Sequence, residues 1–306
     1  MEVLRTPDER FADLPGYPFA PHYVDVSDQD AAHPGGTLRV HYLDEGPADG
    51  AVVLCMHGEP SWSYLYRKMI PLLVDAGHRV IAPDLVGFGK SDKPSRKSDY
   101  TYARHVAWMR EAIVDHLDLR DATFFGQDWG GLIGLRLVAE QPDRFDRVIV
   151  GNTGLPTGEG RPSDAFMAWQ RFSQTTPVFD IGGLINMATV TELSPAEVAA
   201  YDAPFPDDTY KEGARIFPSL VPTRPDDPAA EANKAAWEVF RRWEKPFITC
   251  FSDRDPVTAG GDAPFRKLVP GAQGQPHVTV ADAHHFFQED AAPQLAQIII
   301  DAIAAG

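Results

Sequence analysis

Short strand-like runs alternate with helical segments along most of this 306-residue chain, and few folds are compatible with that order. The predicted strands are Leu38–Leu43, Val52–Met56, Arg79–Pro83, Ala122–Gly126, Arg147–Gly151, Phe247–Phe251 and His277–Val280. From Val52 onward the predicted helices lie between them, notably Tyr64–Val74, Ala103–Leu117, Leu132–Glu140 and Ala292–Ala304. The alternation predicts an α/β fold with a mainly parallel central sheet covered by helices on both faces.

The alternation stops between about Thr153 and Pro228, where the chain is rich in Pro, Gly, Phe and Trp. Short helical pieces are predicted there at Asp164–Ser173 and Pro195–Tyr201. We therefore expect a core made of residues 1–152 and 229–306, with residues 153–228 inserted as a helical cap. Ligands of such sheets bind beyond the carboxyl ends of the strands, so the cap is expected over that end.

The net charge of the chain limits the classes of partner that it is expected to bind. Lys and Arg total 28 against 44 Asp and Glu, a net charge of −16, and a field of that sign repels nucleic acid. The amino terminus lacks a secretion signal, and no apolar run approaches the roughly 20 residues that span a bilayer. Cys55 and Cys250 each lie in an apolar run and are expected to be buried free thiols. We expect a monomeric, cytoplasmic protein with a small-molecule partner and no membrane association.

One predicted strand ends in the sequence Gly126-Gln-Asp-Trp-Gly130, and the following residues predict a buried helix. The spacing is that of a nucleophile elbow, a sharp strand-to-helix turn that exposes its central side chain and needs small flanking residues. The central residue is usually serine, but here it is Asp128. A carboxylate is already ionised at neutral pH and attacks carbon without help from a base.

A carboxylate that forms an ester with its substrate requires a second base to activate the water that releases the product. His285, which follows the last predicted strand, is chosen over His284 for this role. Asp255, which follows the strand before it, is expected to accept a hydrogen bond from His285 and fix its tautomer. Asp253 is the alternative and is expected to cap its own turn. The chain order nucleophile, acid, histidine is typical of α/β-hydrolases.

The tetrahedral intermediate of ester hydrolysis requires an oxyanion hole. Its expected donors are the backbone N–H groups of Trp129 and Glu59, and each such donor contributes about 2.7–4 kcal/mol in known cases. The Glu59 side chain is a separate question, since a carboxylate near Asp128 is repelled unless it is turned away or hydrogen-bonded. Two segments resemble nucleotide-binding motifs but lack the glycines that those motifs require: Gly89-Lys-Ser91 and Gly126–Gly131. Neither a cofactor nor a metal is therefore expected.

Across nearly its whole length the sequence resembles the haloalkane dehalogenases of the α/β-hydrolase superfamily. The resemblance rests on four motifs: His57-Gly-Glu-Pro-Ser-Trp-Ser-Tyr-Leu-Tyr66, Asp84-Leu-Val-Gly-Phe-Gly-Lys-Ser-Asp-Lys-Pro94, Gly126-Gln-Asp-Trp-Gly-Gly131 and His285-Phe-Phe-Gln-Glu289. It implies that Asp128 displaces halide from a haloalkane carbon and that water activated by His285 hydrolyses the alkyl-enzyme ester.

In one subfamily two indole N–H groups bind the departing halide, one from the residue after the nucleophile and one from the cap. The resemblance assigns these roles to Trp129 and Trp169, and it implies that Phe166, Phe217 and Pro218 line the substrate pocket. Glu59, where another subfamily has asparagine, and the absence of a carboxylate in Val150-Gly-Asn-Thr-Gly154 favour the subfamily with the cap tryptophan.

The nearest alternative is an epoxide hydrolase, which shares the fold and the aspartate nucleophile. Epoxide opening requires an acid, usually a pair of cap tyrosines, and Tyr201 and Tyr210 are available. Gln127, where epoxide hydrolases often have histidine, and Trp169 favour dehalogenation. A binding module that had lost its catalytic groups would show a broken set, whereas this chain retains every member.

Overall fold

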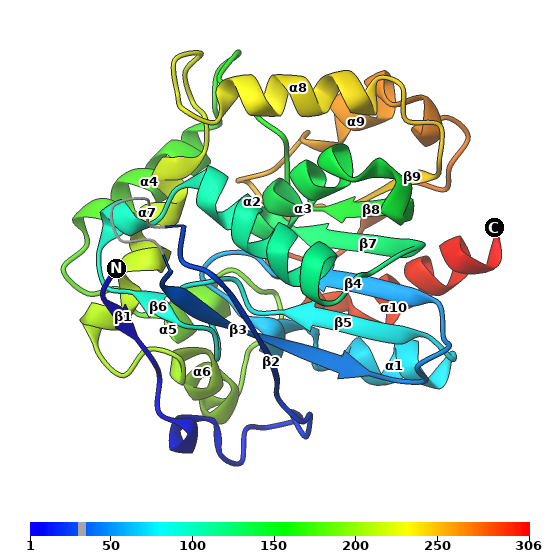
Figure 1. Ribbon diagram of the computed structural model, residues 1–306. Coiled ribbons are helices and arrows are strands. Elements are labelled where there is room, and N and C mark those ends of the chain that lie inside the picture. Colours follow the sequence, from blue (N-terminus) through cyan, green and yellow to red (C-terminus); the bar gives the residue numbers. More distant parts are fainter. Residues whose placement is uncertain (30–34) are drawn as a thin grey trace.

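The computed structural model describes residues 1–29 and 35–306, and its centre is a twisted eight-stranded sheet (Figure 1). The strand order is β10-β9-β8-β7-β4-β5-β3-β2. Strands β10 to β5 run parallel, and β3 is antiparallel to both of its neighbours. The strands of this sheet are β2 (His22–Ser27), β3 (Thr37–Glu45), β4 (Val52–Met56), β5 (Arg79–Pro83), β7 (Ala122–Gln127), β8 (Phe145–Gly151), β9 (Phe247–Ser252) and β10 (Val278–Val280).

Helices cover both faces of the sheet. Helix α3 packs on β4, β7 and β8 and is flanked by α2 and α8, whereas α10 packs on β7 and β10 beside α1. The α-helices are α1 (Ile70–Asp75), α2 (Tyr102–Arg110), α3 (Asp128–Glu140), α4 (Asp164–Thr175), α5 (Ile181–Met187), α6 (Pro195–Asp202), α7 (Glu212–Leu220), α8 (Ala230–Phe240), α9 (Asp262–Leu268) and α10 (Phe287–Ala304). The short helical turns are η1 (Asp8–Phe11), η2 (Ser63–Tyr66), η3 (Lys97–Asp99), η4 (Glu111–His116), η5 (Pro142–Arg144), η6 (Asp208–Lys211) and η7 (Pro270–Ala272). The expected α/β architecture is confirmed.

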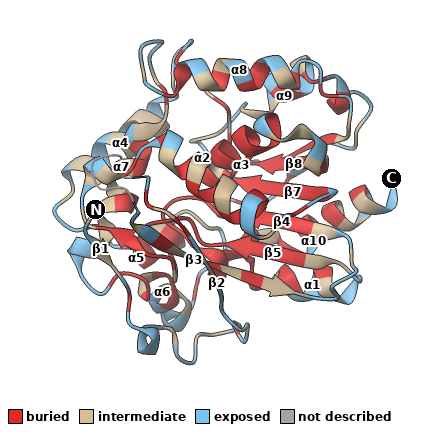
Figure 2. Cartoon of the chain, viewed as in Figure 1, coloured by how far each residue is buried: buried red, intermediate tan, exposed pale blue. Residues whose placement is uncertain are grey.

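The central parallel strands are buried on both faces, which explains their almost continuous apolar sequences (Figure 2). Residues 53–56 of β4 and all six residues of β7 are buried. Strand β2, His-Tyr-Val-Asp-Val-Ser, lies at the edge of the sheet and is mostly accessible. Its mixed sequence carries little apolar signal, so it was not among the predicted strands. A separate two-stranded pairing of β1 (Val3–Leu4) and β6 (Lys93–Pro94) was also missed.

Two of the predicted helices are wrong in extent. The predicted helix Tyr64–Val74 is divided into the 3₁₀ turn η2 and the short helix α1. Pro71 is the physical reason, because proline lacks an N–H group and is accommodated in the first turn of a helix. The predicted helix Ala103–Leu117 is α-helical up to Arg110 and then continues as the π-helical turn η4.

The helices α4, α5, α6 and α7 lie between β8 and α8 in the sequence and gather at one side of the molecule (Figure 1). We refer to Asp164–Leu220, which contains them, as the inserted helices. Helix α4 packs against α7, and α5 packs against α6. Capping side chains define their starts: Ser163 accepts a hydrogen bond from the Phe166 amide, and Ser194 forms a capping box with Glu197.

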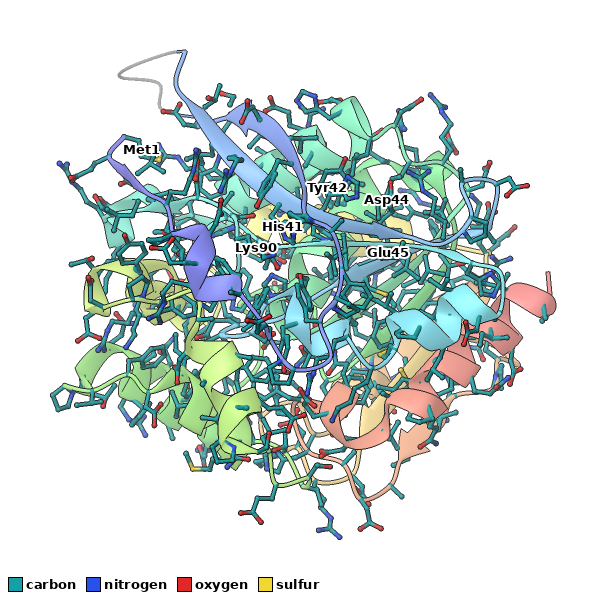
Figure 3. The ribbon with its side chains drawn as sticks, turned by 90° about the horizontal axis from the view of Figure 1, so that it is seen from below. Met1, His41, Tyr42, Asp44, Glu45 and Lys90 are labelled. Carbon is teal, nitrogen blue, oxygen red and sulfur yellow. The ribbon has the colours of Figure 1, made fainter. Side chains whose placement is uncertain are left out.

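The loops that follow β4 and β5 are joined by Asp84, which is fully buried. One carboxylate oxygen accepts the Ser63 amide at 2.7 Å, and the other lies 2.7 Å from Nδ1 of His41. His41 belongs to β3 and is labelled in Figure 3. In addition, the Leu85 amide donates to Nε2 of His57 at 2.9 Å. These contacts fix the loop that contains Glu59 relative to the end of the sheet. No helix within residues 1–29 and 35–306 is long and apolar enough to cross a membrane.

Candidate active site

Asp128 stands at the junction of β7 and α3 with a backbone φ of +49°, in the left-handed region. The turn is possible because glycines without side chains lie next to it. A Cβ atom added at Gly130 would come within 2.0 Å of the Met56 carbonyl oxygen, and one at Gly58 within 2.4 Å of the Asp128 Cβ atom. The sequence expectation of a sharp turn with a protruding carboxylate therefore agrees with the backbone geometry.

The two oxygens of the Asp128 carboxylate have different surroundings. Oδ1 accepts a hydrogen bond from the Glu59 amide at 2.8 Å, whereas Oδ2 lies 3.6 Å from Nε2 of His285. The backbone of Asp128 is held by the Asn152 carbonyl, which accepts its N–H at 3.0 Å, and by the Thr153 hydroxyl, which donates to its carbonyl at 2.7 Å. One oxygen is thus held by the protein, and the other faces the histidine.

His285 lies between two carboxylates. Its Nδ1 is 2.8 Å from Oδ2 of Asp255, and its Nε2 faces Asp128. Burial lowers the pKa of His285, but the charges and hydrogen bonds of Asp255 and Asp128 outweigh burial and raise that pKa to about 10. Burial raises the pKa of Asp255, and the charge of His285 together with its hydrogen bond outweighs burial and holds that pKa well below its usual range. The two carboxylates that flank His285 therefore both favour its protonated form.

The two alternative residues have different surroundings. Asp253 is exposed, and the hydrogen bond that it accepts at 3.4 Å comes from the Ala283 amide in the loop after β10, whereas a cap of its own turn was expected. His284 is half-buried, and its Nδ1 accepts the His285 amide at 2.7 Å. Asp255, by contrast, is 3% exposed and also accepts hydrogen bonds from the Val257 amide and the Thr258 hydroxyl. The structure thus brings Asp128, His285 and Asp255 together, whereas Asp253 is exposed and His284 lines the cavity beside His285.

The expected oxyanion donors flank the same carboxylate. The Glu59 amide already donates to Asp128 Oδ1. The Trp129 amide is the second N–H of α3, where backbone donors have no acceptor within the helix. Both donors thus come from backbone positions that the fold leaves available beside Asp128.

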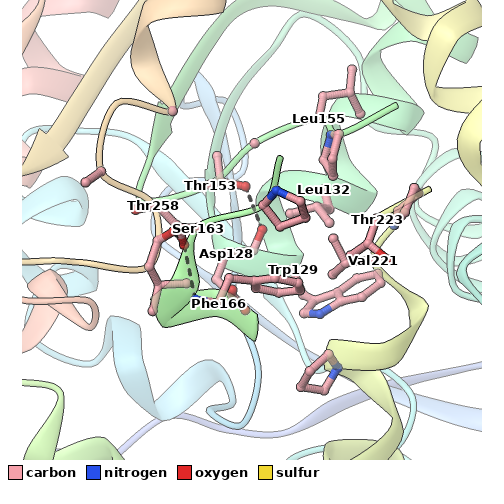
Figure 4. A pocket seen from close by; sticks show the side chains of 18 of the residues that line it. Asp128, Trp129, Leu132, Thr153, Leu155, Ser163, Phe166, Val221, Thr223 and Thr258 are labelled. Carbon is pink, nitrogen blue, oxygen red and sulfur yellow. Dashed lines mark hydrogen bonds between the residues drawn. The ribbon is translucent and has the colours of Figure 1, made fainter. Parts of the chain in front are cut away.

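A cavity of about 1110 Å³ opens beside Asp128, and Figure 4 shows part of its lining, including Trp129 and Phe166. Its wall is formed by the inserted helices, by α8 and by the segments that follow β8 and β9. Trp129 of α3 and Trp169 of α4 both line it, as do Phe166 and Pro218. Further apolar contributors were not predicted from the sequence, because their side chains come from a helix, a strand end and the inserted segment: Leu132, Leu155, Leu184 and Val221. Most of the wall is apolar, with Asp128 and His285 at its base.

Phe217 was expected on the pocket wall, but it is not among the described residues that line the cavity. It is fully buried behind Trp129, with the two ring centroids 4.5 Å apart. Its ring also contacts His105 at 4.3 Å and Phe88 at 4.9 Å. The reason is the helical period of α7, which places Pro218 on the cavity side and Phe217 in the core. Phe217 therefore supports the Trp129 indole from behind.

The cap tyrosines that an epoxide hydrolase would require are not in the cavity. None of the described residues that line it is a tyrosine. The Tyr201 hydroxyl is buried and donates to Glu289, and Tyr210 packs at the edge of the core. The wall above Asp128 offers indole donors in their place.

Two residues near the catalytic groups were not predicted from the sequence as structural supports. Gln127 directs its amide nitrogen to Nε2 of His285 at 3.1 Å and to the His285 carbonyl at 3.2 Å. Asn152 donates from its side chain to the carbonyls of His284 and His285, both at 3.0 Å. The sequence offered one indication of this role: both residues are amides at the carboxyl ends of neighbouring strands. In the structure they hold the loop that contains His285.

The chain matches the family model for the alpha/beta hydrolase fold over residues 51–292, which defines its class as an α/β-hydrolase. It is 60% identical to a haloalkane dehalogenase of Psychrobacter cryohalolentis over 303 residues, covering 99% of this chain and 98% of that one. It is 55% identical to a haloalkane dehalogenase of Mycobacterium marinum, covering 98% and 99% of the two chains. The chain belongs to the haloalkane dehalogenase family.

A solved structure supports the same grouping. The haloalkane dehalogenase DpaA of Paraglaciecola agarilytica, whose structure is described as tetrameric, superposes with a TM-score of 0.88. The two sequences are 38% identical, and the match covers 100% of this chain and 99% of the other. The fold observed here therefore also occurs in a solved haloalkane dehalogenase.

Proposed function

We propose that this protein hydrolyses the carbon–halogen bond of haloalkanes, giving alcohol, halide and a proton, through an ester formed on Asp128. One observation carries the proposal: the Asp128 carboxylate, the His285–Asp255 pair and two indole side chains all meet at a single apolar cavity. Family membership supports the same chemistry.

In the first step Oδ2 of Asp128 attacks the carbon that bears the halogen. A carbon–oxygen bond forms, the carbon–halogen bond breaks, and its electron pair leaves with the halide. The indole N–H groups of Trp129 and Trp169 stabilise that charge. Indole nitrogen donates but cannot accept, so two such groups favour an anion over the neutral carbon–halogen bond, and this difference lowers the barrier.

In the second step water adds to the carboxyl carbon of Asp128 while Nε2 of His285 takes its proton. Oδ1, which is held by the Glu59 amide in the resting site, becomes the oxyanion, and the Trp129 amide is the second donor. Collapse of the intermediate breaks the bond between the carboxyl carbon and Oδ2, and His285 returns its proton to Oδ2, which leaves as the oxygen of the alcohol. The water oxygen takes its place on Asp128, and the remaining proton of the water passes from the new carboxyl group to His285. Asp128 returns to its carboxylate form.

Esterification itself prepares His285 for this step. In the resting site the charge of Asp128 helps to raise the pKa of His285 to about 10, a value at which an imidazole is a poor base at neutral pH. The ester carries no charge, so this contribution to the pKa is lost once the alkyl group is attached. The pKa of His285 then falls, and the base becomes available when it is needed.

We further propose that residues 153–228 act as a cap on a core made of residues 1–152 and 229–306. The inserted helices supply Trp169, Phe166 and Pro218 to the cavity, whereas the core supplies Asp128 and His285. Substrate selection would then depend in part on the inserted helices, because their apolar side chains contribute to the cavity wall. A monomeric state and a cytoplasmic location remain our predictions.

The first prediction concerns the reaction itself. Wild-type protein should release halide from a short 1-haloalkane, and Asp128→Ala should lower the rate by at least roughly 10⁴-fold, as loss of a nucleophile does in other hydrolases. Halide released per unit time is the measurement. Asp253→Asn is the matched control, since this exposed carboxylate lies near the site without contacting His285, and it should retain the wild-type rate. Turnover of styrene oxide without any halide release would assign the site to epoxide hydrolysis instead.

A further inference from the structure

Glu59 places a second carboxyl group in the active site, and the mechanism above uses only its backbone amide. The side chain lines the cavity together with Asp128 and Trp169, yet the residue is 3% exposed. Its Oε1 atom is buried without a hydrogen-bond partner among the described residues. A buried carboxylate of this kind normally has a cation or several donors around it.

The charges around Glu59 oppose its ionisation. The groups that act on the carboxyl come from three elements: Asp128 at the start of α3, His285 in the loop before α10, and Trp169 on α4. In the described part of the chain neither a lysine nor an arginine is among them. His285 is already shared between Asp255 and Asp128, so it cannot also neutralise a third carboxylate.

We propose that Glu59 is a neutral carboxylic acid in the resting enzyme, and that this acid is a positioning residue for the Trp169 indole. As a neutral group it adds no negative charge beside Asp128 and beside the place where halide charge develops. Its carbonyl oxygen accepts the Trp169 N–H while the site is empty and gives it up to the halide. This inference rests on the proposed halide role of Trp169.

The protonation state has a physical cause. Burial raises the pKa of Glu59 well above its usual range, and the charge of Asp128 raises it further. His285 and the Trp169 side chain lower that pKa and offset the increase only in part. In the unfolded chain Glu59 would ionise near its ordinary value, so at neutral pH folding must bind one proton at this residue.

The proposed proton on Glu59 can be tested without substrate, through the pH dependence of folding stability. The native state holds one more proton at Glu59 than the unfolded state does above about pH 4.5, so wild-type stability falls with rising pH relative to Glu59→Gln. The ratio of the two folding equilibrium constants should fall steadily between pH 5 and pH 8, by up to about tenfold per pH unit as long as the pH stays below the raised pKa of native Glu59. Chemical unfolding of both proteins across that range measures this ratio.

Glu238→Gln is the matched control, because Glu238 is an exposed carboxyl at the mouth of the same cavity. Its stability relative to wild type should not vary with pH in this range. A pH-independent difference between wild type and Glu59→Gln would show that Glu59 is ionised and would overturn the proposal. Because no turnover is measured, that outcome would leave the ester mechanism intact. Conversely, evidence against the ester mechanism on Asp128 would not affect the proposal that Glu59 is protonated.

The positioning role is tested by bromide affinity at pH 7, measured as inhibition by added bromide. Glu59→Leu keeps the volume but loses the acceptor that the Trp169 N–H must leave before it donates to the halide, so it should bind bromide roughly fivefold more tightly than Glu59→Gln, in line with one neutral hydrogen bond. Equal affinity in these two variants would contradict positioning of Trp169. Bromide binding at least tenfold tighter in Glu59→Gln than in wild type would contradict the neutral acid, since it would mean that a negative charge had been removed. If Glu59→Leu does not fold, the Glu59→Gln measurements alone decide.

Discussion

Asp128 has a backbone φ of +49°, a conformation that costs a non-glycine residue on the order of 1–3 kcal/mol. The hydrogen bonds of its own amide to Asn152 and of Thr153 to its carbonyl help to offset this cost. As a result one carboxylate oxygen is held by the Glu59 amide while the other faces His285 and the cavity. The division of roles between the two oxygens follows from this single residue's conformation.

Trp169 is the residue on which halide specificity depends in this account. Trp169→Phe removes the indole N–H and keeps an aromatic ring that can stack on Phe172 and Phe179. We expect bromide to bind roughly ten- to hundredfold more weakly, the value of one hydrogen bond to a charged group. The measurement is inhibition of turnover by sodium bromide, compared with another sodium salt at equal ionic strength.

Trp243→Phe is the control for this substitution. Its indole nitrogen is buried without a partner among the described residues, and its side chain lines a separate hollow away from Asp128. The control should leave the bromide inhibition constant at its wild-type value. An unchanged constant in Trp169→Phe would remove Trp169 from the halide site.

At the scale of elements, helix α6 is joined to the core by a buried charge network. Arg67, which follows η2, pairs with Glu289 of α10 and with Glu197 of α6, whose Oε1 accepts from Nη2 at 2.7 Å. Tyr201 of α6 donates its hydroxyl to the same Glu289. Because these groups come from both the inserted helices and the core, the network fixes one side of the inserted helices over the sheet.

Glu289→Gln tests this network. The substitution leaves Arg67, whose side chain is 3% exposed, without its main counter-charge, and breaking a buried pair in this way costs about 3–5 kcal/mol. Urea unfolding should therefore give a free energy of unfolding lower by that amount. Asp115→Asn, which breaks an exposed pair with Arg110, should cost less than about 1 kcal/mol. A Glu289→Gln variant as stable as Asp115→Asn would show that the network does not stabilise the fold.

The same scale explains what the sequence could and could not predict. Asp128, Asp255 and His285 follow three strands in the order of an α/β-hydrolase, and the parallel sheet brings those strand ends together. Phe217 was misplaced because one residue along a helix changes the face by about 100°, which a family pattern without coordinates does not resolve. The role of Tyr201 depends on Glu289, 88 residues away, and pairings between distant elements leave no local pattern.

At the scale of the whole molecule, residues of both the core and the inserted helices line the site. In the proposed mechanism the core supplies the nucleophile, the base and the oxyanion donors, and the inserted helices supply Trp169, Phe166 and Pro218 to the cavity wall. The net charge of −16 is compatible with the proposed mechanism, in which the substrate is neutral and two indole N–H groups stabilise the developing halide locally. Expulsion of the halide after the first step is favoured by the same overall charge.

The covalent intermediate is the central claim, and trapping it is the most direct test. His285→Ala removes the base of the second step and leaves Asp128 free to attack, so the alkyl ester should accumulate. After incubation with a 1-bromoalkane, mass spectrometry of the intact variant should show one added alkyl group, located on the peptide that contains Asp128, and one bromide released per protein molecule. An unmodified His285→Ala protein, or an alkyl group on another residue, would contradict the ester mechanism.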